Sequence, residues 1–168
     1  MSQQPIIDSY AFVRDSGRIE RTLDIASMQR LLDQLHSSEG SLDYVLAGRK
    51  GERGQSELVL GIRGRLMLIC QRCLEGVPFD LVIDTVLELV REDDEIADEL
   101  LEDDDRDFVL ASEALDVAAL VEDEVILALP LIPAHTVCSL PAAASAGETP
   151  SPFAVLSHLN AAPKGKPN

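Results

Sequence analysis

Apolar residues recur at every second position along two consecutive stretches of the sequence, and this period constrains the fold more than any other feature. A β-strand directs alternate side chains to opposite faces, so each stretch predicts a strand with one apolar face. The two stretches flank the turn Cys70-Gln71-Arg72-Cys73 and predict one long β-hairpin over residues 57–90. The apolar positions are Leu58, Leu60, Ile62, Leu66, Leu68 and Cys70 before the turn, and Val77, Phe79, Leu81, Ile83, Leu87 and Leu89 after it.

The residues between these apolar positions carry opposite charges in the two arms. The first arm has Arg63 and Arg65, and the second has Asp80, Asp84 and Glu88. Opposite charges that face each other across a strand pair stabilise one register over its neighbours. We therefore expect the two polar rows to lie on the same face of the hairpin.

Further alternating stretches predict additional strands around the hairpin. Residues 41–47 alternate in the same way and precede the hairpin without a long crossover. Three successive strands connected by short loops are typical of an antiparallel meander. Shorter strands are expected within residues 6–13 and 108–110.

Two segments carry the spacing of helices that would pack on this sheet. Asp24 is a plausible cap for an amphipathic helix that ends near Ser37, with apolar residues from Met28 onward at intervals of three, four and seven. Asp116 is expected to cap a second helix over residues 116–129, which Pro130 ends. The fold class is therefore α+β, an antiparallel meander with a long central hairpin packed by two helices.

The chain divides into one domain and a tail. Residues 1–140 are expected to form the single α+β domain. Residues 141–168 are expected to form an Ala-rich flexible tether, a short docking helix over 152–159 and a disordered end. A helix of about two turns is unstable alone, so it should dock on its own domain or on a partner. Its apolar contacts would be Phe153, Leu156 and Leu159.

Charge is distributed unevenly along the sequence, whose formal net charge is −16. Residues 88–124 hold seventeen carboxylates against two arginines, and an acidic loop after the hairpin is expected there. The net charge opposes non-specific binding to nucleic acid or anionic membranes. The acidic segment would either confer solubility or recruit a basic partner, such as a ribosomal protein.

Six basic residues are clustered within residues 49–72, before the acidic segment. They are either a solvated strand face or a patch that contacts RNA phosphates or an acidic partner. With so few cations in a negative molecule, RNA binding would be weak and sensitive to salt. The six are Arg49, Lys50, Arg53, Arg63, Arg65 and Arg72.

The Cys70-x-x-Cys73 pair has three interpretations. A redox pair of the thioredoxin type lies at the N-terminus of a helix, whereas here a strand follows. Structural zinc needs four soft or borderline ligands, and His135 and Cys138 would complete such a set. The third interpretation is a metal-free turn with buried thiols.

The run Glu122-Asp123-Glu124 interrupts the apolar second helix. Three adjacent helical residues point about 100° apart, so they cannot all share one solvent face. We expect Glu124 to lie among apolar neighbours and to form a salt bridge with a hairpin arginine. The alternative is a partner-binding carboxylate or one with a perturbed pKa.

The sequence offers no positive sign of catalysis or of membrane insertion. It has no nucleophile–histidine signature and no phosphate-binding Gly-rich loop, and no small-molecule substrate is evident. The first ten residues lack the apolar core of a secretory leader, and the longest apolar run falls short of the ~20 residues needed to span a bilayer. We expect a cytosolic protein with reduced thiols.

Several motifs resemble the YceD family, the bacterial large ribosomal RNA subunit accumulation proteins. These are Leu68-Ile69-Cys70-Gln71-Arg72-Cys73, the segment 121–130 (VEDEVILALP), Pro133-Ala134-His135 with Cys138, and Pro152-Phe153-Ala154-Val155-Leu156. The resemblance implies a non-enzymatic cytosolic factor for the synthesis, processing or stability of 23S ribosomal RNA. It implies 23S RNA or its precursor as a direct or indirect partner. The acidic segment 88–124 would then hold a basic ribosomal protein or another assembly factor.

Two rival functions remain at this stage. One is an enzyme, either a thiol oxidoreductase or a metal-dependent RNA nuclease that uses the Cys70-x-x-Cys73 site. The other is a protein adaptor that never contacts RNA.

Overall fold

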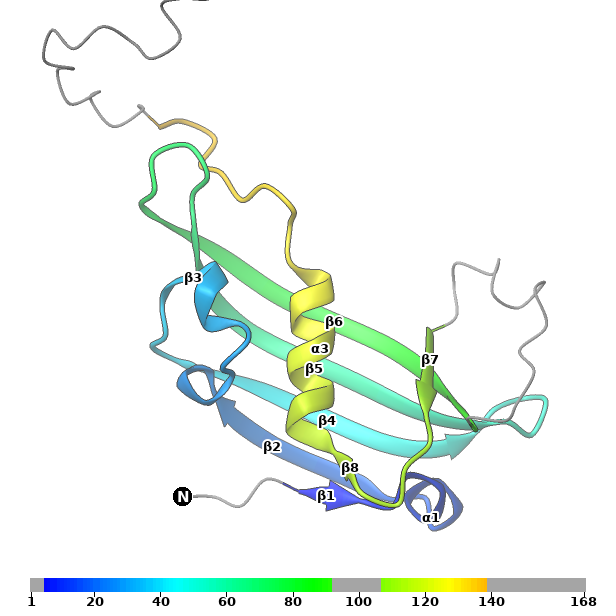
Figure 1. The fold of residues 1–168 in the computed structure, drawn as a ribbon. Coiled ribbons are helices and arrows are strands. Elements are labelled where there is room, and N and C mark those ends of the chain that lie inside the picture. The colour runs from blue at the N-terminus through cyan, green and yellow to red at the C-terminus, as the bar shows by residue number, and fades with distance from the viewer. Residues whose placement is uncertain (1–4, 92–106, 139–168) are drawn as a thin grey trace, which may run out of the picture.

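A six-stranded sheet forms the body of the molecule in the computed structural model, which describes residues 5–91 and 107–138. The strand order is β2-β4-β5-β6-β7, and β3 pairs with β5 beside the end of β4. Among the described strands of this sheet, β6 and β7 run parallel, whereas the other pairs are antiparallel (Figure 1). The strands are β2 (Arg18–Asp24), β3 (Leu35–Ser37), β4 (Ser41–Lys50), β5 (Ser56–Ile69), β6 (Gly76–Val90) and β7 (Asp107–Leu110).

The predicted long hairpin is confirmed as β5 and β6. Their register runs unbroken from Glu57 opposite Glu88 to Ile69 opposite Gly76. The polar rows meet as expected, because Arg65 lies directly opposite Asp80 and the two form an ion pair. The antiparallel meander β4-β5-β6 is confirmed as well, and the fold is α+β.

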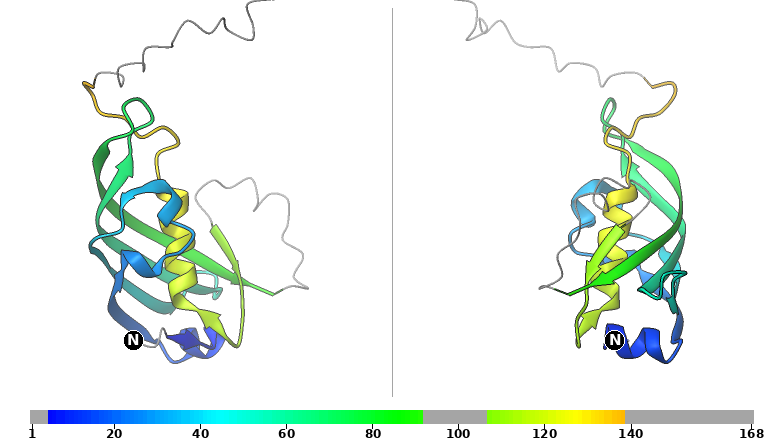
Figure 2. Two further views of the ribbon diagram at one scale, coloured as in Figure 1. Left: turned by 60° about the vertical axis from the view of Figure 1, so that its left-hand side comes forward. Right: turned by 90° about the vertical axis from the view of Figure 1, so that its right-hand side faces the viewer.

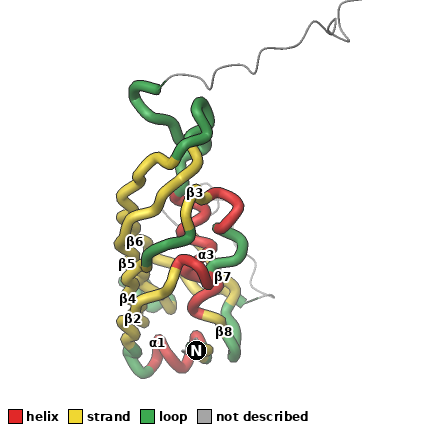
Figure 3. Tube along the Cα trace, turned by 90° about the vertical axis from the view of Figure 1, so that its left-hand side faces the viewer, coloured by secondary structure: helices red, strands yellow, loops and turns green. Residues whose placement is uncertain are grey.

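Helices cover one face of the sheet, and no described element covers the other (Figures 2 and 3). The main covering element is α3 (Val117–Ala128), whose cap Asp116 accepts hydrogen bonds from the backbone N–H groups of Ala118 and Ala119. The short α1 (Ser9–Arg14) packs near one end of the sheet. The strands β1 (Ile6–Ile7) and β8 (Leu115–Asp116) pair beside it.

The core lies between this helical layer and the apolar face of the sheet. Leu58, Leu60 and Ile62 of β5 are fully buried, as their spacing predicts. On β4, Gly48 lets α1 approach, since a Cβ added there would lie 2.7 Å from Cα of Val13. The core also includes Leu42, Leu46, Leu66, Leu68, Leu81, Leu87, Val117, Val121 and Val125.

The prediction of a helix that Asp24 caps and that ends near Ser37 is wrong. This segment instead forms two 3₁₀ turns, Ile25–Ser27 and Leu32–Gln34, followed by β3. Met28 and Leu31 are buried all the same, so their spacing reflects contact with the core rather than a helical ladder. Glu122 of α3 accepts the backbone N–H groups of Arg30 and Leu31, which fixes the turn conformation from outside the segment.

The prediction of a short strand within residues 6–13 is only partly confirmed. Residues 6–13 contain the two-residue strand β1, and α1 begins directly afterwards. Asp8 determines this change, because its Oδ1 accepts the N–H of Ala11 as a helix cap. The strand at 108–110 is confirmed within β7, although its parallel pairing was not anticipated.

Two expected features lie outside the described residues. They are the bulk of the acidic loop at 92–106, and the tail with its docking helix at 152–159 and its apolar residues Phe153, Leu156 and Leu159.

Candidate metal centre

Two segments distant in the sequence meet at the tip of the β5–β6 hairpin. One is the turn Cys70–Cys73, and the other is the extended stretch 130–138 that follows α3. The N–H of Gln71 donates to the carbonyl of Pro133 at 2.8 Å, and Arg72 reaches the carbonyl of Cys138 at 3.4 Å. The segment after the helix is therefore held against the hairpin turn by its backbone.

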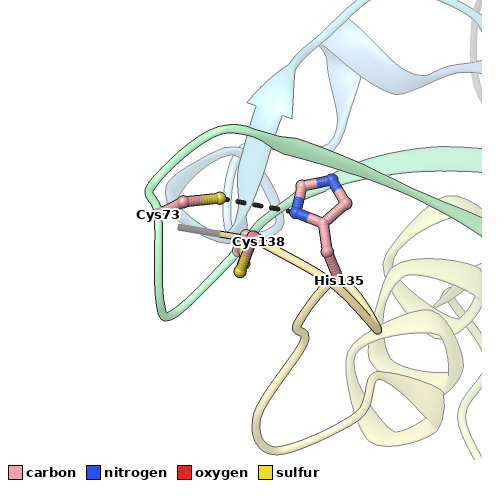
Figure 4. A group of neighbouring side chains, drawn as sticks. Cys73, His135 and Cys138 are labelled. Atoms are coloured by element: carbon pink, nitrogen blue, oxygen red, sulfur yellow. Dashed lines mark hydrogen bonds between the residues drawn. The ribbon is translucent and has the colours of Figure 1, made fainter. Parts of the chain in front are cut away.

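This contact brings together the four predicted metal ligands Cys70, Cys73, His135 and Cys138. Their ligand atoms all lie within 4.8 Å of one another. Sγ of Cys70 is 4.0 Å from Sγ of Cys138. Sγ of Cys73 is 3.4 Å from Nδ1 of His135, and Figure 4 shows this contact with Cys138 beside it. Cys70 is buried, whereas the other three are partly exposed.

These distances fit a tetrahedral ion. A zinc–sulfur bond of about 2.3 Å places two tetrahedral sulfur ligands roughly 3.8 Å apart, and a sulfur–nitrogen pair slightly closer. The Cys70–Cys138 and Cys73–His135 distances lie near those two values. Three thiols and an imidazole are also the donor types that zinc prefers. The donor set therefore fits structural zinc, and all four ligands would be supplied by the protein.

Two backbone hydrogen bonds and one left-handed residue shape the turn between the two cysteines. The N–H of Leu74 donates to the carbonyl of Cys70, and the N–H of Cys70 donates to the carbonyl of Glu75, both at 2.9 Å. Leu74 adopts a left-handed conformation with φ of 65°, which is unfavourable for a residue with a branched side chain. The turn thus brings the Sγ atoms of Cys70 and Cys73 within 4.8 Å of each other.

Backbone N–H groups prepare Cys70 to act as a thiolate. Hydrogen bonding from the backbone of Cys73, with further contributions from the backbones of Arg72 and His135, lowers the pKa of Cys70 to about 5. Burial and the neighbouring thiols raise the pKa of Cys138. The site thus favours one negative charge in the absence of a cation, and a bound cation would favour deprotonation of the remaining thiols.

The ring of His135 is oriented by a second contact. Its Nε2 lies 3.1 Å from the carbonyl oxygen of Gly76 at the start of β6. A carbonyl only accepts, so Nε2 carries the proton and Nδ1 is left with its lone pair toward Cys73. Such a backbone partner fixes the tautomer of many zinc-bound histidines.

Most of the predicted basic residues pair with acidic or polar neighbours. Arg49 and Arg53 form ion pairs with Glu57 and Glu88, and Lys50 donates to the hydroxyl of Ser56. On the bare face of the sheet, Arg63 pairs with Asp84 and Arg65 pairs with Asp80. Arg72 stands apart from this group at the hairpin tip. The basic cluster is therefore a band of paired charges rather than a single positive patch.

The carboxylates of α3 are arranged differently from the prediction. Glu122, not Glu124, is the most buried of the three, at 9 % exposure. Its partner is Arg30 rather than a hairpin arginine, and Arg30 also pairs with Asp123. The sequence carried no signal for Arg30, because the pairing depends on the turns that replace the expected helix.

Glu124 lies part-way between core and solvent. Partial burial, together with the nearby carboxylates of Asp107 and Asp123, raises the pKa of Glu124. The alternative of a carboxylate with a perturbed pKa therefore fits Glu124, and the expected salt bridge to a hairpin arginine is absent from the described residues.

The model of the family described as "Large ribosomal RNA subunit accumulation protein YceD" matches residues 58–160. The chain belongs to the YceD family. The match over residues 58–160 includes nearly all of the hairpin, α3 and the four candidate metal ligands of this YceD protein. Neither a curated protein nor a solved structure matches the chain. In the part of this YceD protein that the structure describes, neither helix has the length and apolarity that crossing a bilayer requires.

Proposed function

We propose that this protein is a cytoplasmic, non-enzymatic factor that supports the synthesis, processing or stability of 23S ribosomal RNA during assembly of the large subunit. The observation that carries the proposal is the family match over residues 58–160, since the family is described by accumulation of the large ribosomal RNA. The matched region contains the hairpin and α3, so the proposed activity is assigned to this framework rather than to the N-terminal strands.

The metal centre has a structural role in this proposal. One zinc ion bound by Cys70, Cys73, His135 and Cys138 would fasten the segment after α3 to the hairpin tip. All four coordination positions are then protein ligands, which is typical of structural rather than catalytic zinc. The thiols lie at a hairpin turn and not at a helix N-terminus, which supports this role over a disulfide oxidoreductase.

The experiment is depletion of the protein in its own cells, followed by measurement of 23S relative to 16S RNA. The ratio should fall, and wild-type protein should restore it. His135→Ala should restore it less well, whereas His36→Gln should restore it fully. His36 is a suitable control because it also lies near Gly76 at the hairpin tip but is outside the ligand cluster. An unchanged ratio after depletion would contradict the proposal.

A second candidate function is a protein adaptor that reaches ribosomal precursors without contacting RNA. The observation that favours it is the pairing of Arg49, Arg53, Arg63 and Arg65 with carboxylates, which leaves little free positive charge for phosphates. Basic ribosomal proteins or assembly factors would then be the direct partners. Affinity purification with and without RNase distinguishes the two, because an adaptor retains its partners after RNA is digested.

A further inference from the structure

Among the strands that the structure describes, β6 has one edge paired over nearly its whole length and one largely open edge. Along one side it pairs with β5 over nearly its whole length, and along the other it pairs with β7 only from Leu87 to Val90. Among the described residues, no strand pairs with the open edge between Phe79 and Val86. Pro78, which has no N–H to donate, precedes this stretch, so the open edge has a defined length.

The backbone N–H and C=O groups of the even-numbered β6 residues point toward the open edge. The carbonyl of Gly76 contacts His135, and the carbonyl of Val90 accepts the N–H of Ala111, so both point away from β5. Antiparallel pairing alternates strictly in an unbroken register. The N–H and C=O groups of the even-numbered residues 80–86 therefore point outward, and an added strand would find an evenly spaced row of donors and acceptors.

The same even-numbered residues place their side chains on the bare face of the sheet. Their order along the strand is Asp80, Val82, Asp84, Val86, an alternation of carboxylate and valine. Val82 is 67 % exposed, which is unusual for a valine in the middle of a long strand. Asp80 and Asp84 pair with arginines of β5, yet their side chains remain 72 % and 70 % exposed. Each carboxylate has room for a second cation.

The opposite edge of the described sheet does not show this alternation of exposed carboxylates and valines. Its edge strand, β2, carries Arg18, Glu20, Arg21 and Asp24 within seven residues. Charges of both signs along an edge strand discourage pairing with other chains. The open stretch of β6 has charge of one sign only, separated by exposed valines. The two edges therefore differ in the chemistry they offer to an extended chain.

We propose that β6 accepts an extended basic segment of a partner protein as an additional strand along residues 79–86. The backbone would supply hydrogen bonds, and alternate side chains would supply specificity, as in other cases of strand addition. Lysine or arginine would lie opposite Asp80 and Asp84, and β-branched or apolar residues would lie opposite Val82 and Val86. The partner is thus recognised by a period-two pattern of cations and apolar residues.

A second copy of this chain is a poorer occupant of the same edge. Its own β6 would present only carboxylates, valines and Pro78 on that face, and no cation for Asp80 or Asp84. Like charges opposite each other destabilise a strand pair. The proposal also stands independently of any role in ribosomal RNA metabolism, because it concerns which peptides the full-length protein binds.

The test uses the full-length protein and synthetic peptides long enough to span residues 79–86. The probe is Thr-Lys-Thr-Val-Thr-Lys-Thr-Val, and its control is Thr-Glu-Thr-Val-Thr-Glu-Thr-Val. A third peptide is N-methylated at its lysines and valines, which removes the N–H groups without changing charge. We expect the lysine peptide to bind and to slow hydrogen exchange of the Val82 and Asp84 amides. The glutamate and N-methylated peptides should do neither.

Matched variants of the protein test whether the lysine peptide binds at the open edge of β6. The double substitution Asp80→Asn and Asp84→Asn should weaken binding of the lysine peptide by roughly five- to tenfold. Thr22→Lys on the opposite edge should leave it unchanged. The proposal is overturned if the lysine and glutamate peptides bind equally, or if binding leaves the Val82 and Asp84 amides unprotected. It is also overturned if these amides are already protected in the free protein, because the chain itself or a second copy then occupies the edge.

Discussion

Glu122 shows how one side chain organises a segment far away in the sequence. Its Oε1 accepts the backbone N–H groups of Arg30 and Leu31, and its Oε2 accepts Nε of Arg30. The carboxylate therefore satisfies backbone donors that a helix would otherwise have satisfied internally. Arg30 in turn donates to the carbonyl of Ala119 and to Asp123, so the turn and α3 are joined by several charged hydrogen bonds.

Replacement of Glu122 by glutamine should be costly because the carboxylate is buried and bonded. We expect Glu122→Gln to lower the free energy of unfolding by about 2 kcal/mol, since a charged acceptor is lost while its donors remain. Urea unfolding at neutral pH measures this change. Asp123→Asn is the matched control, because Asp123 pairs with the same arginine but its side chain is 53 % exposed. Equal losses for the two variants would contradict the assigned role of Glu122.

Glu124 should make stability depend on pH in the opposite sense to most acidic residues. Its folded-state pKa is raised, so the stability it contributes is greatest below the unfolded pKa and is lost as pH rises through the folded pKa. Glu124→Gln should therefore raise Tm modestly at pH ~7 and have little effect near pH ~4. Thermal scans at the two pH values measure this change in Tm. Glu113→Gln is the control, because Glu113 is exposed. A rise in Tm at the lower pH alone would exclude a destabilising charge on Glu124 as the cause.

At the scale of elements, the hairpin tip and α3 are coupled through the segment that follows the helix. Pro130 prevents α3 from continuing, and the chain then runs extended to the cysteine turn. Few apolar contacts hold this stretch, since Leu131 and Val137 are almost fully exposed. Within the described residues, the attachment therefore depends on the cluster of four candidate metal ligands and on backbone hydrogen bonds such as that from Gln71 to Pro133.

Removal of metal should release this segment without unfolding the sheet. Protein purified without added zinc should contain about one zinc ion per chain, and Cys73→Ser should reduce this to a small fraction. A chelator should speed hydrogen exchange of the Gln71 amide, while amides within β4 and β5 keep their protection. Elemental analysis and exchange measurements test this. His36→Gln should retain full zinc content, and zinc-free wild-type protein with a protected Gln71 amide would refute the structural role.

At the scale of the whole molecule, charge is separated along the chain but locally balanced on the sheet. The net charge of −16 is concentrated after the hairpin, whereas the arginines of β4, β5 and the loop between them pair with carboxylates of β5 and β6. Long-range repulsion from phosphate is thus combined with the pairing of Arg49, Arg53, Arg63 and Arg65 to carboxylates. This arrangement favours contact with a basic protein over direct contact with RNA.

Binding of purified protein to RNA should accordingly be weak and governed by a few paired arginines. We expect little retention of a 23S fragment at about 150 mM salt in the absence of other proteins. Asp80→Asn combined with Asp84→Asn should strengthen binding several-fold at low salt, because it frees Arg63 and Arg65. Filter binding over a salt series measures both. Tight binding by the wild type that is insensitive to salt would identify a direct RNA contact elsewhere.

The sequence by itself determined those features that depend on local periodicity and capping. The alternation from Leu58 to Leu89 indicated the hairpin, because a period of two leaves one buried face and one register. Asp116 and Pro130 bounded α3 correctly, because caps and proline act on their immediate neighbours. The four candidate metal ligands were also named from residue type, and the structure brings all four together.

Only the tertiary structure decided features that depend on contacts between distant residues. Met28 and Leu31 have helical spacing, yet Glu122, about ninety residues away, accepts the N–H groups nearby and turns replace the helix. Whether the hairpin arginines are free or paired likewise depended on which strands became neighbours. The open edge of β6 also depends on tertiary structure. Whether a described strand pairs along residues 79–86 is decided by how distant segments pack, and no local pattern specifies that.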